Sequence, residues 1–148
     1  AVRTRPRRAR PGTRGAAPFA PKMAAGSFPD GFPTDCPPRQ AGDANGTACR
    51  SVRAPPLRDD DFRSYAELGL LPSADACRRH GLSVFRSFQE ARHQQNLRPW
   101  LGGFISAGTL DSSAGKTMLT NPKTGHITWW PYAGIDRKVY FAEPEPCL

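Results

Sequence analysis

The sequence predicts a small α+β domain, in which two or three short helices pack on an antiparallel sheet of three to five strands, preceded by a long extended region rich in proline and arginine. Two uneven distributions indicate this division. Ten of the 16 prolines lie at or before Pro56, whereas 11 of the 14 aromatic residues lie between Phe62 and Phe141. We therefore expect three parts: a basic arm or leader at 1–29, an extended segment at 30–58 and the folded domain at 59–148.

The basic charge of the chain belongs to its first 29 residues. Net charge is +8, and the seven basic residues before Asp30 account for +7 of it. Prolines and glycines interrupt any helix there, so the arm is expected to be disordered when free. It is predicted to contact RNA or an acidic partner. The alternatives are that residues 1–22, ahead of Met23, are a targeting peptide or leader, or upstream sequence that does not belong to the native protein. The predicted contact residues are Arg3, Arg5, Arg7, Arg8, Arg10 and Arg14.

Two short helices are expected at the start of the folded part. Three aspartates precede Phe62 and Tyr65, which are spaced as on one face of a helix, and Gly69 ends that helix. A second helix of about two turns is expected between Ser73, as its N-cap, and Gly81, as its left-handed exit.

A strand at 82–85 and a longer helix follow. Ser87 and Glu90 have the spacing of a capping box, in which each side chain accepts a hydrogen bond from the backbone N–H of the other. This helix is predicted to run to Leu97, ahead of a proline and two glycines. Residues 104–110 then alternate like a strand.

A β-hairpin is predicted around the loop 121–125, which holds a proline and a glycine. With symmetric closure, three cross-strand pairs share one face: Thr120 with His126, Met118 with Thr128, and Lys116 with Trp130. The other face is more apolar and is the expected core side; it carries Thr117, Leu119, Ile127 and Trp129. A last strand is expected at 138–141.

One face of this hairpin gathers an imidazole, a hydroxyl, a cation and an aromatic ring, from His126, Thr128, Lys116 and Trp130. Such a set can stack on a ring and hold a phosphate or carboxylate. One hypothesis is therefore a small enzyme or ligand-binding domain in which His126 acts as acid or base. In the alternative interpretation, Trp130 packs under a helix and His126 only forms hydrogen bonds at a strand end.

The hypothesis that we place first is a non-catalytic accessory subunit of a large assembly, because the long arm and the proline-rich segment need partners to order them. Its predicted docking residues are Trp100, Trp129, Trp130 and Tyr132. The expected partners are other protein subunits, and RNA for the arm. An organelle is the expected setting, with the cytoplasm as the alternative. No cofactor is expected, and no apolar run is long enough to span a membrane.

The four cysteines allow either two disulfides, in three connectivities, or free thiols. No secretory signal is evident in the sequence, so we expect free thiols in a reducing or organellar compartment. Cys77 and His80 form a single short-spaced pair, which is too few ligands to predict a metal site. The stretch 108–117 ends in Gly115, Lys116 and Thr117, as a phosphate-binding loop does. However, its first glycine, Gly108, is too far from Gly115 for that motif, and no helix is expected to follow.

Overall fold

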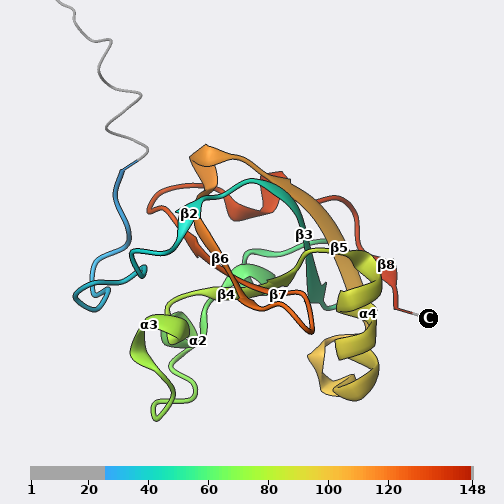
Figure 1. Ribbon diagram of the computed structural model, residues 1–148. Helices are drawn as coiled ribbons and strands as arrows, with labels where there is room; N and C mark the ends of the chain where they lie inside the picture. The colour runs from blue at the N-terminus through green and yellow to red at the C-terminus, as the bar shows by residue number, and fades with distance from the viewer. Residues whose placement is uncertain (1–25, 148) are drawn as a thin grey trace, which may run out of the picture.

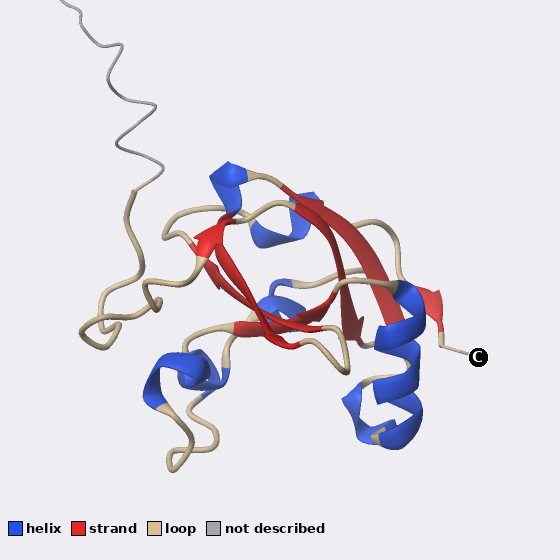
Figure 2. Cartoon of the chain, in the orientation of Figure 1, coloured by secondary structure: helices blue, strands red, loops and turns tan. Residues whose placement is uncertain are grey.

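The computed structural model describes residues 26–147, which form an α+β fold with one seven-stranded antiparallel sheet and three α-helices (Figures 1 and 2). The strand order is β2-β6-β7-β4-β3-β5-β8. The strands are β2 (Gly42–Asp43), β3 (Gly46–Val52), β4 (Leu82–Phe85), β5 (Phe104–Leu110), β6 (Gly115–Asn121), β7 (His126–Pro131) and β8 (Glu145–Pro146). The predicted α+β class is confirmed. None of the described helices has both the length and the apolar character needed to cross a membrane.

The helices are α2 (Tyr65–Leu68), α3 (Ala76–Arg79) and α4 (Phe88–Leu97), with 3₁₀ turns η1 (Asp59–Phe62), η2 (Pro99–Leu101), η3 (Ser112–Ala114) and η4 (Arg137–Tyr140). The predicted cap of α4 is present, because Ser87 Oγ accepts a hydrogen bond from the N–H of Glu90 (3.1 Å). The other two helices are each four residues long. The first begins later than predicted, after Ser64, since the acidic run before it forms η1 instead.

The sheet has seven strands rather than the three to five that the sequence predicts. Strands β4 to β7 correspond to four predicted strands, and β2, β3 and β8 are additional. The strand predicted at 138–141 is wrong: the Asp136 carboxylate accepts a hydrogen bond from the N–H of Lys138 (3.3 Å), and the chain turns into η4. The additional strands escape sequence analysis because they are very short or, in β3, carry small residues at buried positions.

One extended stretch of chain, residues 42–52, connects the two sides of the sheet. β2 pairs with β6, while β3 pairs along its whole length with β5. Only Ala44 and Asn45 separate the two strands, and the N–H of buried Ala44 donates to the carbonyl of Gly115 (2.9 Å). The sheet therefore curls around its own core (Figure 2), and residues 42–52 of the segment 30–58 belong to it.

The interior of the curled sheet holds the main apolar core. Its largest buried side chains are Trp129, Phe62, Leu82, Val84, Val52, Leu110 and Phe141. The indole N–H of Trp129 donates to the carbonyl of Ala114 (3.0 Å), so this buried polar group is satisfied. The prediction that Trp129 and Ile127 face the core is confirmed, whereas Leu119 on the same predicted face is exposed.

The hairpin β6–β7 has the predicted register except at its loop end. Met118 lies opposite Thr128 and Lys116 opposite Trp130, as predicted. Asn121, not Thr120, lies opposite His126, because a β-bulge interrupts the ladder between Leu119 and Asn121.

The covering segment, residues 26–41 ahead of β2, lies over the outer face of the hairpin. The ring of Phe28 lies 5.0 Å from that of Tyr132, and the ring of Phe32 lies 5.0 Å from that of His80, measured between centroids. The indole N–H of Trp130 donates to the carbonyl of Cys77 (2.9 Å). Because of this cover, Trp129 on one face of the hairpin and Trp130 on the other are both buried.

A disulfide joins this covering segment to α3. Cys36 and Cys77 are bonded, with their Cα atoms 5.4 Å apart. The expectation of free thiols is therefore wrong for this pair, since the fold brings together two cysteines that are 41 positions apart. Cys49 and Cys147 are free and buried, and burial raises the pKa of the Cys49 thiol.

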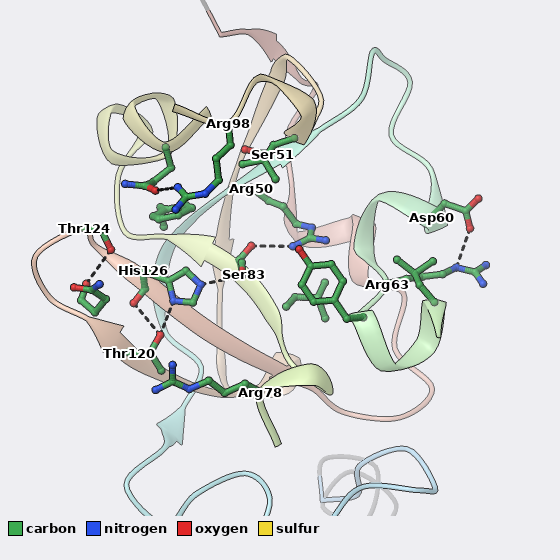
Figure 3. Close-up of a pocket in the computed structure, with 17 residues that line it drawn as sticks. Arg50, Ser51, Asp60, Arg63, Arg78, Ser83, Arg98, Thr120, Thr124 and His126 are labelled. Atoms are coloured by element: carbon green, nitrogen blue, oxygen red, sulfur yellow. Dashed lines mark hydrogen bonds and ion pairs between the residues drawn. The ribbon is translucent and has the colours of Figure 1, made fainter. Parts of the chain in front are cut away.

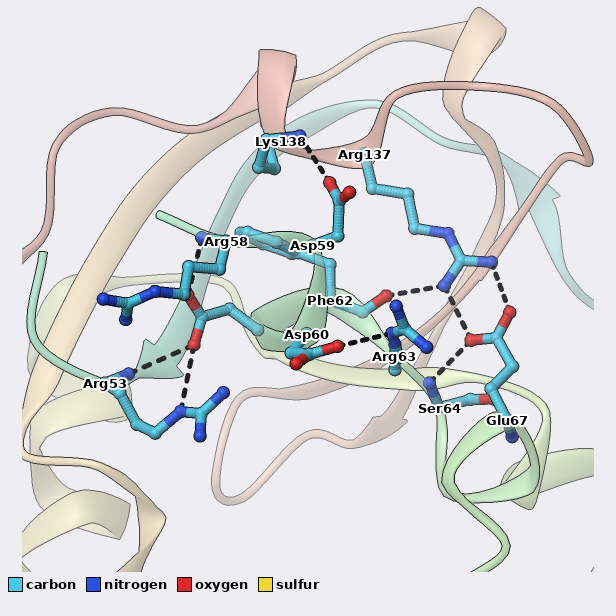
Figure 4. Close-up of polar contacts among 11 residues, drawn as sticks. Arg53, Arg58, Asp59, Asp60, Phe62, Arg63, Ser64, Glu67, Arg137 and Lys138 are labelled. Carbon is cyan, nitrogen blue, oxygen red and sulfur yellow. Dashed lines mark hydrogen bonds and ion pairs between the residues drawn. The ribbon is translucent and has the colours of Figure 1, made fainter. Parts of the chain in front are cut away.

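Ion pairs tie η4 to η1 and α2 (Figure 4). The guanidinium of Arg137 binds both carboxylate oxygens of Glu67 (2.7 and 2.8 Å) and the carbonyl of Phe62 (2.6 Å). The ammonium of Lys138 binds the carboxylate of Asp59 (2.5 Å). These ion pairs add to the contact between the rings of Phe62 and Phe141, whose centroids lie 4.7 Å apart, in holding the two pieces of chain together.

Candidate functional site

A cavity of about 510 Å³ opens on the face of the molecule formed by β3 and β4. Its remaining walls come from η1 and α2 on one side, α4 and η2 on the other, and the β6–β7 hairpin together with α3 (Figure 3). Four arginines line it: Arg50, Arg63, Arg78 and Arg98. Asp60 is the only carboxylate among the described lining residues, so the cavity carries an excess of positive charge.

We call this cavity the arginine pocket. Arg50, on β3, lines it. Its Nε donates to the carbonyl of Asp61 (2.6 Å) and its Nη1 to the carbonyl of Ser83 (2.8 Å). The guanidinium carbon also lies 5.8 Å from the centre of the Phe62 ring. Burial lowers the pKa of Arg50 to about 10, and the group stays cationic at neutral pH. The backbone thus fixes this cation in place without neutralising it.

The other three arginines differ in how strongly they are held. Arg63 forms an ion pair with Asp60 (2.8 Å), and Arg98 donates to the side-chain oxygen of Gln94. Among the residues that the structure describes, the side chain of Arg78 makes no hydrogen bond or ion pair. Only Arg63 therefore has its charge balanced by a direct carboxylate partner at the pocket.

His126 stands at the start of β7 and binds a hydroxyl with each ring nitrogen. Its Nδ1 lies 2.6 Å from Thr120 Oγ1, and its Nε2 lies 2.8 Å from Ser83 Oγ. The desolvation that comes with burial, together with the positive charge of Arg78, lowers the pKa of His126 below its ordinary value of 6.5. Both effects favour the neutral form of the imidazole.

Strand register explains how these groups meet. Ser83 lies opposite Thr128 on the neighbouring strand, and His126 is two residues from Thr128, so all three side chains share one face of the sheet. The Thr120 hydroxyl of β6 lies against the same imidazole, beside the bulge between Leu119 and Asn121.

Of the predicted ligand site, the structure brings together His126 and Thr128 only. Thr128 is buried and reaches His126 through Thr120, whose Oγ1 lies 3.1 Å from Thr128 Oγ1. Lys116 points away, to an ion pair with Asp43 (2.8 Å), and Trp130 is fully buried under α3. The structure does not bring these two residues to His126, because each has a partner elsewhere.

The predicted docking face is also divided by the fold. Trp129 and Trp130 have no exposed surface and Tyr132 has 6%, so none of them is available to a partner on this structure. Trp100 on η2 is 77% exposed and remains a candidate. The six arginines predicted to contact RNA or an acidic partner lie outside the described residues.

Sequence analysis missed the pocket arginines and Ser83. These residues come from β3, β4, α3 and the positions directly after η1 and α4, and nothing in their spacing shows that they converge. The capping and hairpin patterns that located the neighbouring elements carry no information about how β3 is placed against them. Among the described residues, no group of histidines, cysteines or carboxylates has the arrangement needed to hold a metal ion.

Comparisons of the chain with protein-family models, curated proteins and solved structures found no match.

Proposed function

We propose that the arginine pocket binds a small organic anion that carries phosphate groups. The observation that carries the proposal is the convergence of Arg50, Arg63, Arg78 and Arg98 on one cavity whose described lining holds a single carboxylate. Four like charges repel one another, and a bound anion would relieve that repulsion. Guanidinium groups match the oxygens of phosphate in geometry as well as in charge.

The rest of the lining favours an organic ligand over a bare ion. Tyr65 and Leu68 of α2, Leu82 and Phe85 of β4, and Leu101 of η2 contribute apolar surface. The volume of about 510 Å³ lies within the range of cavities that bind cofactor-sized and drug-sized molecules. A ligand with a ring and one or more phosphates would use both kinds of surface, as a nucleotide does.

A buried hydroxyl in the lining also lacks a partner. Ser51 Oγ has no hydrogen-bond partner within the described chain, although the atom is screened from solvent. Buried hydroxyls normally form hydrogen bonds, so a ligand oxygen is a fitting acceptor for this one. Ser51 follows Arg50 on β3 and lines the same cavity.

Thermal unfolding of the full chain with added ligands tests the proposal. The probes are ADP, pyrophosphate and inorganic phosphate, with adenosine as the uncharged comparison. ADP is expected to raise Tm most, pyrophosphate and phosphate less, and adenosine least, because a ligand that binds the folded state stabilises it. If none of the three phosphate-bearing probes raises Tm at low salt, the proposal is wrong.

A pair of arginine variants makes the test specific. Arg98→Gln is expected to weaken ADP binding about tenfold, as titration calorimetry would measure, since one charge-assisted contact contributes on the order of 1.4 kcal/mol. Arg39→Gln removes an exposed arginine that does not line the pocket and is expected to leave ADP affinity unchanged. An equal loss in both variants would point to general charge attraction rather than to this pocket.

The accessory-subunit hypothesis remains a second proposal, with a smaller docking surface than the sequence suggests. What favours it is the exposure of Trp100 and of Leu97, three positions before it at the end of α4, which is 58% exposed. Exposed tryptophan and leucine side chains are features of surfaces that bind other proteins. Co-purification of the full chain with partner subunits, lost in Trp100→Ala, would support it, and retention of every partner in that variant would contradict it.

A further inference from the structure

We propose that Ser83 is a nucleophile activated by His126, and that the arginine pocket transfers a phosphoryl group from its ligand to this hydroxyl and then to water. This inference rests on the proposed function, because it takes the anion bound in the pocket as the substrate. It adds a reaction and assigns roles to three side chains: Ser83 as nucleophile, His126 as base and Thr120 as a positioning residue.

The first support is geometric. Ser83 Oγ is exposed in the cavity and lies 2.8 Å from His126 Nε2, which is the distance expected between a nucleophile and its base. On its other side the imidazole is held by Thr120 Oγ1, 2.6 Å from Nδ1. A nucleophile, a base and a group that orients the base are thus connected in one chain of hydrogen bonds.

The positions of the protons in these hydrogen bonds also support the proposal. Thr120 has one hydroxyl proton, and the carbonyl of His126 lies 3.2 Å from its oxygen as an acceptor. If Thr120 donates there, its oxygen accepts from Nδ1–H, and Nε2 then carries the free lone pair. That lone pair faces the Ser83 hydroxyl, which donates to it. This is the tautomer in which His126 can remove the proton of Ser83.

The surroundings of the imidazole keep it neutral and ready to accept a proton. The charged group acting on it is Arg78 of α3; Ser83 and the ring of Phe85, 5.4 Å away between centroids, face it from β4, and Thr120 faces it from β6. The described pocket lining places no carboxylate in hydrogen-bond contact with it. The negative charge of a bound phosphate would offset the positive charge that His126 gains in the reaction.

The reaction is balanced with water as the second reactant. Ser83 Oγ forms a bond to the phosphorus of a phosphate ester while the bond from phosphorus to the ester oxygen breaks, and the electron pair leaves on that oxygen. The Ser83 proton passes to His126 Nε2 and from there to the departing oxygen. Water then attacks the phosphoserine and gives its proton to Nε2, the P–Oγ bond breaks, and Ser83 regains a proton from His126. The products are an alcohol and inorganic phosphate.

A fluorophosphonate probe tests whether Ser83 is activated, and it does so while the natural substrate is still unidentified. Attack by Ser83 Oγ on the probe releases fluoride, and the labelled peptide is located by mass spectrometry. Labelling of Ser83 is expected in the native full chain, and His126→Gln is expected to slow it roughly 100-fold, the usual contribution of a general base. Ser73→Ala, at an exposed serine outside the pocket, is the control and should not change the rate.

Absence of label on Ser83, or an unchanged rate in His126→Gln, would overturn the proposal. A measurement on the unmodified chain covers the case in which a variant fails to fold. The labelling rate is expected to rise with pH with the same midpoint as the NMR titration of His126, because only the neutral imidazole accepts the proton. Two different midpoints would also overturn it.

Thr120 is tested by its effect on the tautomer of His126. Thr120→Val keeps the shape but removes the hydroxyl; it is expected to shift the ¹⁵N signals of His126 away from the Nδ1–H form and to slow labelling about tenfold. Thr120→Ser is expected to restore both. If Thr120→Val leaves the ¹⁵N signals and the rate unchanged, Thr120 has no positioning role.

Binding and labelling together separate this inference from the proposed function. If ADP stabilises the chain but Ser83 is not labelled, the pocket binds anions and the nucleophile proposal alone falls. If Ser83 is labelled but no phosphate-bearing probe binds, the phosphoryl substrate is wrong. Ser83→Ala is expected to abolish labelling while leaving ADP binding in place, since the arginines supply the binding contacts.

Discussion

Arg50 shows how the chain builds a fixed positive charge from backbone groups. Its two backbone acceptors, the carbonyls of Asp61 and Ser83, belong to separate elements, η1 and β4. Burial of a cation costs free energy unless hydrogen bonds replace its water, and these carbonyls do so without cancelling its charge. The same guanidinium therefore connects the fold to the pocket: it joins β3 to its neighbours and directs a charge at the cavity.

The lowered pKa of His126 makes the folded chain less stable as the pH falls below 6.5. Because its pKa in the folded chain lies below the ordinary 6.5, the unfolded chain takes up a proton first as the pH falls. The contribution of His126 is therefore fully present above pH 6.5 and declines as the pH falls from there towards the folded pKa. The stability difference between the native chain and His126→Gln, from urea unfolding at several pH values, is expected to shrink over that range. A difference that grows on acidification would contradict the lowered pKa.

At the scale of elements, the clamp between α2 and η4 depends on an ionised Glu67. Burial raises the pKa of Glu67, but hydrogen bonds from Arg137 and Ser64 outweigh it and bring the pKa down to about 2. The stability that this clamp supplies is present above the ordinary pKa of 4.5 and is lost as the pH falls from there to about 2. Glu67→Gln is expected to lower Tm at pH 7 and to flatten its fall below pH 4.5, as differential scanning calorimetry would measure. Equal acid sensitivity in both proteins would contradict this assignment.

Trp130 and Trp100 provide a matched pair of tryptophans, one buried under α3 and one exposed on η2. Trp130→Ala is expected to lower the free energy of unfolding by about 3–5 kcal/mol, because it leaves a cavity and removes the indole hydrogen bond to the carbonyl of Cys77. Trp100→Ala is expected to change it by less than about 0.5 kcal/mol. Equilibrium unfolding in urea measures both. A small loss at Trp130 would make that residue a docking candidate again.

The elements show where sequence analysis succeeds. Patterns confined to a few neighbouring residues, such as the Ser87 cap and the hairpin pairs of Met118 and Lys116, depend on local backbone geometry and are recovered. The bulge before Asn121, and the convergence on one cavity of arginines from β3, from α3 and from the ends of η1 and α4, depend on tertiary packing. His126 is identifiable because hairpin pairing alone places it among polar groups, while Ser83 and Arg50 come from other elements. The burial of Trp130 follows from a covering segment whose position has no local signal.

At the scale of the whole molecule, the Cys36–Cys77 disulfide fixes the covering segment to α3. A covalent link between residues 41 positions apart restricts the unfolded chain, and such links contribute about 2–4 kcal/mol to stability. Cys36→Ser/Cys77→Ser is expected to lower the free energy of unfolding by that amount. A reducing agent is expected to destabilise the native chain but not the double variant.

A thiol count checks the pairing independently. Titration of the unfolded, non-reduced chain with a thiol reagent is expected to find two free thiols, those of Cys49 and Cys147. Four reactive thiols would show that the bond is absent and that the chain is fully reduced. Two thiols would favour an oxidising compartment, where such bonds persist.

The pairing of distant strands has a consequence for how the protein is made. β3 is synthesised early, but its main partner, β5, lies at residues 104–110, and β4 likewise waits for β7 at 126–131. Folds dominated by such non-local pairs form slowly, on the order of milliseconds to seconds. The chain must lose the entropy of closing a long loop before the contacts between distant strands can stabilise it. Until Leu110 has emerged from the ribosome, the nascent chain presents β3 without the strand that covers it. We expect this interval to be the time of greatest aggregation risk and of greatest demand for chaperones.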